Sequence, residues 1–327
     1  MRSTIAAVCV LGLAPAWGCA QAASGSFHRS FPVASGAVNL DVATGSGAVQ
    51  VTGARGSAVV VDATIRENQD WFWGSPDPQA LRQIEQNPPL QQSGNTITIE
   101  RVRPPWGDHI SISYIITTPP STTVRVRSGS GRIEVAGLGG DADLEAGSGS
   151  LHVEDLGGSL RAETGSGRIE FGRVGGEVRI VAGSGSIEGD EAGGRLSAST
   201  GSGHIRVRQL DHGGELHTGS GGIELDQVKG DLRAQGASGS LRVGGMLEGD
   251  QHWNLSTASG SIHISLPPQT AAEVRLQTAS GGISVNHPTQ RQSQFGRHSW
   301  EGVLGPGNAA PTATLVAHAA SGSIVIN

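Results

Sequence analysis

The central part of the chain alternates apolar and polar residues in short stretches that are separated by glycine. Arg168-Ile169-Glu170-Phe171 and Leu160-Arg161-Ala162-Glu163 show the pattern. Alternation with a period of two indicates strands that bury one face. The stretches end at Gly-Gly or at Thr-Gly-Ser-Gly, where glycine adopts backbone angles that other residues resist. We therefore predict a series of short strands joined by glycine corners.

These stretches recur at intervals of 18 residues. The first apolar column is Ile133, Leu151, Ile169, Ile187, Ile205, Ile223 and Leu241. Four further columns begin at Val135, Leu138, Ala142 and Leu144. The column that begins at Leu138 ends at Met246. Only Gly189 and Gly214 leave gaps in the columns. An apolar pattern this regular predicts a repeat architecture.

A fixed period without hairpin turns favours coils stacked on identical coils, about 4.8 Å apart. The sequence therefore predicts an all-β fold, a parallel β-helix or β-solenoid with 18-residue coils. Three apolar segments in each period favour a three-sided coil, and a flattened, two-sided coil is the alternative.

The repeat extends beyond its regular part at both ends. Thr44 to Val49 is an early copy, and between it and the array lies an irregular region with a predicted helix from Pro78 to Gln86, capped by Asp77. Two alternating stretches, Thr96 to Val102 and Ile110 to Thr117, are predicted strands. We expect one domain over residues 23–327, composed of an elaborated N-terminal cap (66–120), regular repeats (128–285) and a C-terminal closing coil (286–327).

The first 22 residues have the composition of a signal peptide. Arg2 is followed by an apolar stretch from Ile5 to Ala16 and by Ala20-Gln21-Ala22, a small-x-small cleavage site. The alternative is lipoprotein processing before Cys19, which would give a lipid anchor there. Either route places the protein outside the cytoplasm, in the periplasm or at the outer membrane or cell surface. No later run reaches the roughly 18 apolar residues that a spanning helix needs.

Composition agrees with a narrow, repetitive core. The chain has 51 Gly among 327 residues but only 6 Trp, 5 Phe and 1 Tyr, and a thin interior has little room for rings. A net charge of −6 gives no electrostatic case for binding nucleic acid. Both cysteines, Cys9 and Cys19, lie in the leader, so we expect no disulfide in the mature protein.

Three motifs support a resemblance to a known family. They are the stretch Ile112-Ser113-Tyr114-Ile115-Ile116-Thr117-Thr118-Pro119, the entry Val124 to Ile133 with its Ser-Gly-Ser-Gly, and the closing Thr314 to Ile326. With the repeats between them, they resemble the bacterial putative-adhesin family of unknown function built from Ser-Gly β-strand repeats. The resemblance covers residues 36–327. It implies a right-handed β-helix and supplies no catalytic residues.

The candidate ligand contacts are Trp71, Phe72, Trp73 and Trp106, which with Tyr114 gather five aromatic residues in one short region. Flat rings suit stacking on sugars. The competing interpretation is that these rings cover the open end of the solenoid, where strand edges and apolar interior would otherwise be exposed.

Two columns of stacked polar residues are further candidate sites. The Ser-Gly serines, among them Ser148, Ser166 and Ser184, lack an accompanying histidine base, so we expect their hydroxyls to bond backbone groups between coils. The outward column contains Glu134, His152, Glu170, Glu188, Arg206, Glu224 and Arg242. Stacked carboxylates could serve a glycosidase or a metal, but alternating charge on an open face favours a solvated ladder. Aspartates keep no fixed position, which argues against calcium rolls.

The sequence thus favours an exported, non-enzymatic cell-envelope protein, an adhesin or binding scaffold without a cofactor. A surface glycan or an envelope protein would be its partner. One alternative is a periplasmic partner in envelope maintenance or signalling that docks through the aromatic end. Another is a polysaccharide lyase or hydrolase, by analogy of fold alone.

Overall fold

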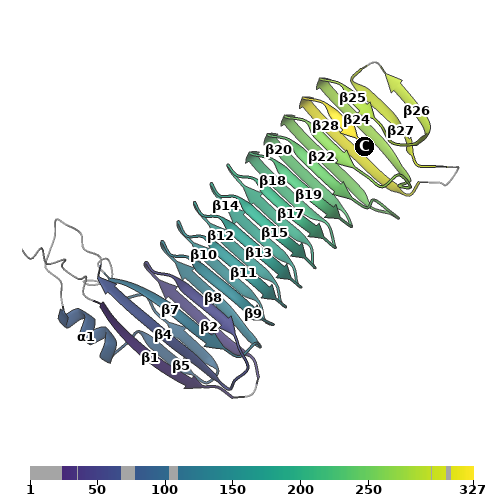
Figure 1. Ribbon diagram of the computed structural model, residues 1–327. Helices are drawn as coiled ribbons and strands as arrows, with labels where there is room; N and C mark the ends of the chain where they lie inside the picture. The colour runs from purple at the N-terminus through teal and green to yellow at the C-terminus, as the bar shows by residue number, and fades with distance from the viewer. Residues whose placement is uncertain (1–23, 35, 68–77, 103–109, 296, 307–310) are drawn as a thin grey trace, which may run out of the picture.

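The computed structural model describes residues 24–34, 36–67, 78–102, 110–295, 297–306 and 311–327. Two long sheets face each other and stack their strands along one axis, so the molecule is elongated (Figure 1). We call the fourteen-stranded sheet A and the fifteen-stranded sheet B. The expected all-β architecture is confirmed.

Sheet A places strands from both ends of the chain at its edges. Its order is β1 (Ser24–Pro32), β4 (Ala58–Glu67), β7 (Ile110–Thr118), β3 (Val49–Gly53), β9 (Ile133–Leu138), β11 (Leu151–Leu156), β13 (Ile169–Val174), β15 (Ile187–Ala192), β17 (Ile205–Leu210), β19 (Ile223–Val228), β21 (Leu241–Gly245), β23 (Ile262–Ser265), β29 (Ile324–Ile326) and β25 (Ile283–Val285).

Sheet B runs along the opposite side of the stack. Its order is β26 (Thr289–Phe295), β27 (Ser299–Leu304), β24 (Ala272–Ser280), β28 (Ala313–Ser321), β22 (His252–Ser259), β20 (Leu232–Ser238), β18 (Gly214–Ser220), β16 (Leu196–Thr200), β14 (Val178–Ala182), β12 (Leu160–Thr164), β10 (Ala142–Ala146), β8 (Thr122–Ser128), β2 (Val38–Thr44), β6 (Thr96–Ile99) and β5 (Leu90–Ser93).

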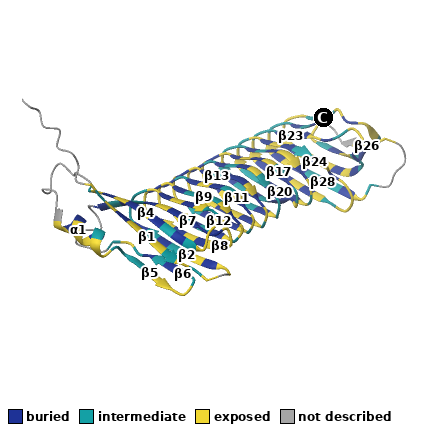
Figure 2. Ribbon diagram, turned by 60° about the horizontal axis from the view of Figure 1, so that its bottom comes forward, coloured by how far each residue is buried: buried dark blue, intermediate teal, exposed yellow. Residues whose placement is uncertain are grey.

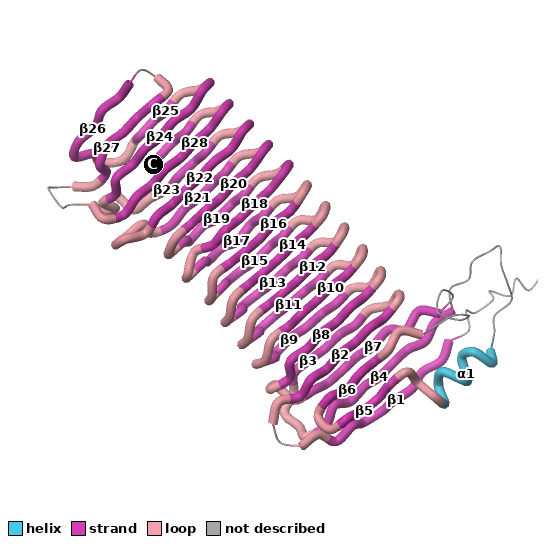
Figure 3. The backbone as a smooth tube through the Cα atoms, turned by 180° about the vertical axis from the view of Figure 1, so that it is seen from behind, coloured by secondary structure: helices cyan, strands magenta, loops and turns pink. Residues whose placement is uncertain are grey.

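Successive repeats contribute one strand to each sheet (Figure 3). Leu151 pairs in parallel with Ile133 on one side and with Ile169 on the other. Apolar side chains therefore lie over one another along the core, and buried residues alternate with more exposed ones on most strands, as on β8 and β10 (Figure 2). The parallel stacking of apolar columns agrees with the sequence analysis.

The three-sided coil favoured by the sequence is wrong. The third apolar position, Leu138 or Leu156, ends the same sheet A strand that carries the first two. The residue before it has a positive φ, 71° at Gly137 and 53° at Asp155, which turns the strand end without starting a third sheet. Met246 also departs from its column, because the β21 register shifts after Val243. Met246 is exposed, and Leu247 is buried in its place.

Glycine is required at the corners because backbones of neighbouring coils approach closely there. A Cβ on Gly149 would lie 1.8 Å from the carbonyl oxygen of Gly131. The corner hydroxyl role belongs to threonine, which corrects the expectation for the serines. Thr164 is buried and donates to Gly149 O at 3.0 Å. The exposed Ser148 and Ser166 take part in none of the side-chain hydrogen bonds of the described chain.

At both ends the chain places one coil between two others. The C-terminal strands β28 and β29 lie between β22/β23 and the earlier β24/β25. Residues 313–326 therefore fill a gap inside the stack and do not form its last layer. Likewise, β2 and β3 lie between β6/β7 and β8/β9.

Antiparallel strands and one helix cover the stack ends. Strands β1 and β4 extend sheet A, and β27 and β26 extend sheet B. Helix α1 (Pro78–Gln86) has the predicted bounds and buries Ala80, Leu81 and Ile84. Its Glu85 accepts a hydrogen bond from the Ser26 amide of β1 at 2.8 Å. No helix of the described residues is both long and apolar enough to cross a membrane.

Candidate binding groove

Outward side chains of neighbouring strands stack into rows, and most of these rows pair their own charges. On sheet A, Arg168 lies 3.3 Å from Glu170 and 3.8 Å from Glu188. His152 lies 3.4 Å from Glu170. All four side chains are substantially exposed. The column considered for a glycosidase or metal site is therefore an ion-pair ladder on an open face.

Glu224 shows the electrostatics of this ladder. It accepts hydrogen bonds from the Arg206 guanidinium, with Arg206 Nε at 3.0 Å, and lies 3.5 Å from Arg242. The hydrogen bonds from Arg206, with the positive charge of both arginines, hold the pKa of Glu224 below its ordinary value. The same contact raises the pKa of Arg206. Each group stabilises the charged form of the other.

The N-terminal half of sheet B is also self-paired. Arg125 lies 2.9 Å from Asp143, which Arg161 approaches at 3.8 Å. Arg127 lies 3.2 Å from Asp41. A ligand on this face would have to compete with these pairs for each charged group.

The row that starts at Arg127 changes character along sheet B. Through the strand registers it continues as Glu145, Glu163, Val181, Ser199, His217, Gln235, Ser256, His318 and Gln277. From Ser199 onward it contains no carboxylate and no guanidinium. We call its last five members, His217, Gln235, Ser256, His318 and Gln277, the groove row.

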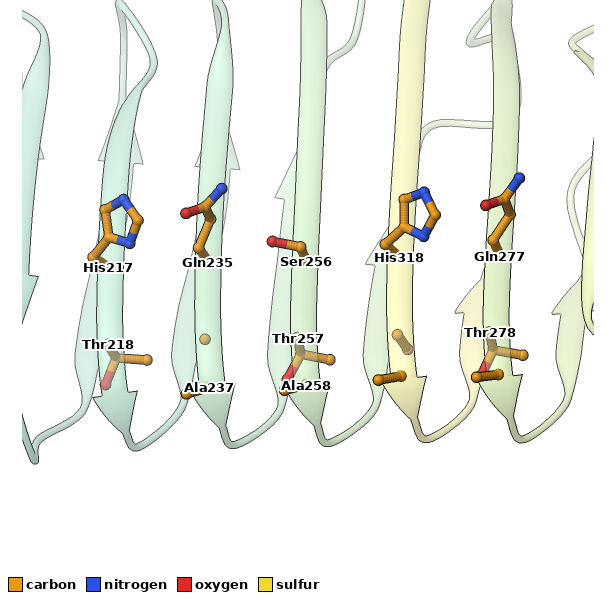
Figure 4. Close-up of a pocket in the computed structure, with 14 residues that line it drawn as sticks. His217, Thr218, Gln235, Ala237, Ser256, Thr257, Ala258, Gln277, Thr278 and His318 are labelled. Carbon is orange, nitrogen blue, oxygen red and sulfur yellow. The ribbon is translucent and has the colours of Figure 1, made fainter.

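The groove row lines one side of a shallow groove of about 810 Å³ across β18, β20, β22, β28 and β24. Its side chains lie side by side on successive strands (Figure 4). Next along the strands come exposed alanines, which we call the alanine row: Ala237, Ala258, Ala320 and Ala279. Thr257 and Thr278 are buried between the two rows and donate to Gly239 O and Gly322 O.

Much of the hydrogen-bonding capacity in the groove row is unused. Within the described chain, the side chains of Ser256, His318 and Gln277 make no hydrogen bond. His217 Nε2 lies 3.6 Å from Glu215, which is too long for a strong contact. When the Gln235 amide is assigned from its hydrogen-bonding neighbours, its oxygen accepts from Arg233 at 3.0 Å.

The residues proposed from the sequence as ligand contacts, Trp71, Phe72, Trp73 and Trp106, lie outside the described residues, as does Cys19. Tyr114 is described and is buried on β7, where Phe27 packs edge to face at 6.4 Å between ring centroids. Burial raises the pKa of its hydroxyl. Tyr114 is therefore a core residue and not a surface contact.

The groove was missed by the sequence analysis, although a weak signal exists. In most regular coils a glycine precedes the corner serine, as in Thr164-Gly165-Ser166-Gly167, whereas the later corners read Thr257-Ala258-Ser259-Gly260 and Thr278-Ala279-Ser280-Gly281. The added methyl groups form the alanine row. In the part of the chain that is described, no group of three or more His, Cys, Asp or Glu is placed to hold a metal ion.

Comparison with solved structures gives two distant likenesses. One is a putative cell adhesion protein from Clostridium sporogenes ATCC 15579, with 9% sequence identity, coverage of 92% of this chain and 99% of that chain, and a TM-score of 0.23. The other is a putative adhesin from Bacteroides fragilis NCTC 9343, with 12% identity, coverage of 93% and 97%, and a TM-score of 0.30.

No curated protein matches the sequence. A family model does match, and it runs from within α1 through all the regular coils to the last residue of the chain, over residues 85–327. This range includes the three motifs and the repeats on which the resemblance was based. The chain therefore belongs to the Toastrack DUF4097 family.

Proposed function

We propose that this protein is an exported, non-enzymatic binding scaffold of the cell envelope, adhesin-like in its function, and that it binds its ligand in the groove on sheet B. The observation that carries the proposal is the groove row. There, unlike on the paired faces of the stack, side-chain donors and acceptors are left without protein partners.

The energetic argument compares the two kinds of surface. A ligand on the Arg125–Asp143 face must displace existing ion pairs, and it leaves a charge unpaired wherever it fails to replace them. A ligand in the groove displaces only water from Ser256, Gln277 and His318. Each new hydrogen bond then adds a modest net gain, and the row offers several of them in line. Covering the groove therefore costs less free energy than covering the paired faces.

Binding is favoured over catalysis by the spacing of the titratable groups. The residues that line the groove include no carboxylate. Its two histidines, on β18 and β28, are three strand spacings apart, roughly 14 Å. That separation exceeds the ≈ 5–9.5 Å at which paired acids and bases act on one glycosidic bond.

The finer architecture belongs to the same proposal. Register partners such as Ile133 and Leu151 lie 18 positions apart, which supports a solenoid of 18-residue coils. A right-handed coil is what the resemblance of the sequence to the putative-adhesin family implies. Export is supported by the leader sequence, from Arg2 through Ala20-Gln21-Ala22, and Cys19 offers the lipidated alternative.

Fractionation of cells that express the full 327-residue sequence tests export. We expect the protein in the periplasm or on the outer membrane. Its mass should correspond either to a chain that starts near Ala23 or to a chain that carries a lipid on Cys19. Cys19→Ala separates these two forms, because only the lipidated form would lose its membrane association. A cytoplasmic chain that retains Met1 overturns export.

Purified protein is then incubated with isolated cell envelopes and with a polysaccharide panel, and both binding and chain cleavage are scored. Saturable binding without cleavage is the expected result. Chain cleavage overturns the non-enzymatic assignment. Absence of saturable binding to every envelope preparation and polysaccharide overturns the binding role.

A further inference from the structure

We infer that the groove on sheet B takes an uncharged, extended polysaccharide chain that runs along the solenoid axis, across the strands. The inference rests on the proposed binding function and adds the chemical class and direction of the ligand. It is carried by the order of side chains on five neighbouring strands and by the charge of that surface.

The direction of the ligand follows from the sheet order. The groove crosses β18, β20, β22, β28 and β24, which are consecutive in sheet B. At about 4.8 Å between strands, the outer members of the groove row lie roughly 19 Å apart. Chemically similar groups therefore repeat along the axis, which suits a polymer with its own repeating hydrogen-bonding groups better than a compact ligand.

A second polar row borders the alanines on their other side. It contains the exposed corner serines, which pair in register from strand to strand: Ser220, Ser238, Ser259, Ser321 and Ser280. The surface thus has a central strip of methyl groups flanked by amide and imidazole groups on one side and hydroxyls on the other. A sugar ring offers C–H groups on its faces and hydroxyls at its edges, which is the complementary arrangement.

The charge of the surroundings selects against other polymers. The nearest arginines already have partners, since Arg233 donates to the amide oxygen of Gln235 at 3.0 Å and Arg275 lies 2.7 Å from Glu273. An acidic polysaccharide or a nucleic acid would meet no free cation there, and phosphate contacts dominate nucleic-acid affinity. An added peptide strand is disfavoured too, because β-augmentation needs a sheet edge, whereas the groove lies on the face of five paired strands.

The test uses two variants with the same substitution in different places. Ala258→Arg places a long charged side chain in the alanine row on β22. Val181→Arg places it on β14, outside the groove, in the row that starts at Arg127, where Val181 is already 40% exposed. Both positions face solvent, so both variants should fold, and circular dichroism checks this.

Neutral hexose oligomers of two to eight units, from β-1,4-glucan, β-1,3-glucan and mannan, are measured beside polygalacturonate by calorimetry. We expect at least one neutral series to bind, with affinity rising with length and then levelling off. The affinity should change by less than about twofold between 0.05 and 0.5 M NaCl, because no exposed ion pair is involved. Ala258→Arg should weaken it at least tenfold and Val181→Arg should leave it unchanged. Gln277→Ala should cost roughly three- to tenfold.

Three outcomes overturn the inference. Neutral oligomers that bind Ala258→Arg as tightly as wild type place the site elsewhere. Salt-sensitive binding of polygalacturonate in preference to neutral oligomers contradicts the ligand class. Binding to isolated envelopes that protease treatment abolishes, with no oligomer bound, assigns the ligand to protein and leaves the proposed scaffold role intact. Loss of all envelope binding refutes that role as well.

Discussion

The ring of Phe171 lies over the backbone of Gly189, its register partner on the neighbouring strand of sheet A. A Cβ on Gly189 would be 2.1 Å from Phe171 Cζ. Phe171, the largest side chain of this apolar column, therefore fills the space that a side chain at Gly189 would occupy. This is why the gap at Gly189 leaves no hole in a column that is otherwise filled by aliphatic residues.

Gly189→Val should destabilise the protein by about 1–3 kcal/mol, because the new side chain overlaps the Phe171 ring. The double variant Phe171→Val/Gly189→Val should recover most of that loss, because two valines restore the regular column. Urea unfolding followed by circular dichroism measures both values. A double variant no more stable than Gly189→Val would show that the two residues do not share space.

Thr164→Val should cost about 1–2 kcal/mol, since it removes the hydroxyl that donates to Gly149 O at 3.0 Å and accepts from Gly167 N at 3.2 Å. Ser166→Ala, two residues later on the exposed corner, should be nearly neutral. Thermal unfolding of the two variants checks this division of roles. If both variants lost the same stability, the serines would contribute to the corner hydrogen bonds as much as the threonines do.

Asp155 has a φ of 53°, a left-handed conformation that β-branched residues resist. Asp155→Val should therefore destabilise the coil by about 1–2 kcal/mol. Asp155→Gly loses the contact with Arg173 but relieves the backbone, and it should change stability by less than the valine variant does. Chemical unfolding of both variants measures the difference, and the reverse order would contradict a strained backbone here.

The lowered pKa of Glu224 predicts a loss of stability in acid. Below its ordinary value of 4.5 the unfolded chain takes up this proton more readily than the folded chain. The stability that the Arg206 contact provides is thus present above that pH and lost as the pH falls through the folded pKa. The melting temperature of wild type should exceed that of Glu224→Gln near pH 7, and the difference should shrink towards pH 3. A constant difference across this range would exclude the ionised pair as its source.

The strands of the regular coils, their parallel stacking and the core columns were all predictable from the sequence. Alternation and glycine corners are local signals, and an exact repeat forces equivalent residues such as Ile133, Leu151 and Ile169 into register. Helix α1 was equally visible, because Ala80, Leu81 and Ile84 lie on one face of a single helix.

Other features depend on residues that are far apart in the chain, and these are visible only in the folded protein. The coil has two sides because Leu138 and Leu156 lie at the ends of sheet A strands. Composition does not distinguish this arrangement from a coil with a third side. The groove exists because β28 returns to lie between β22 and β24, which brings His318 between Ser256 and Gln277. No local pattern encodes this placement, since it is set by which open strand edges the returning chain can pair with once the coils are stacked.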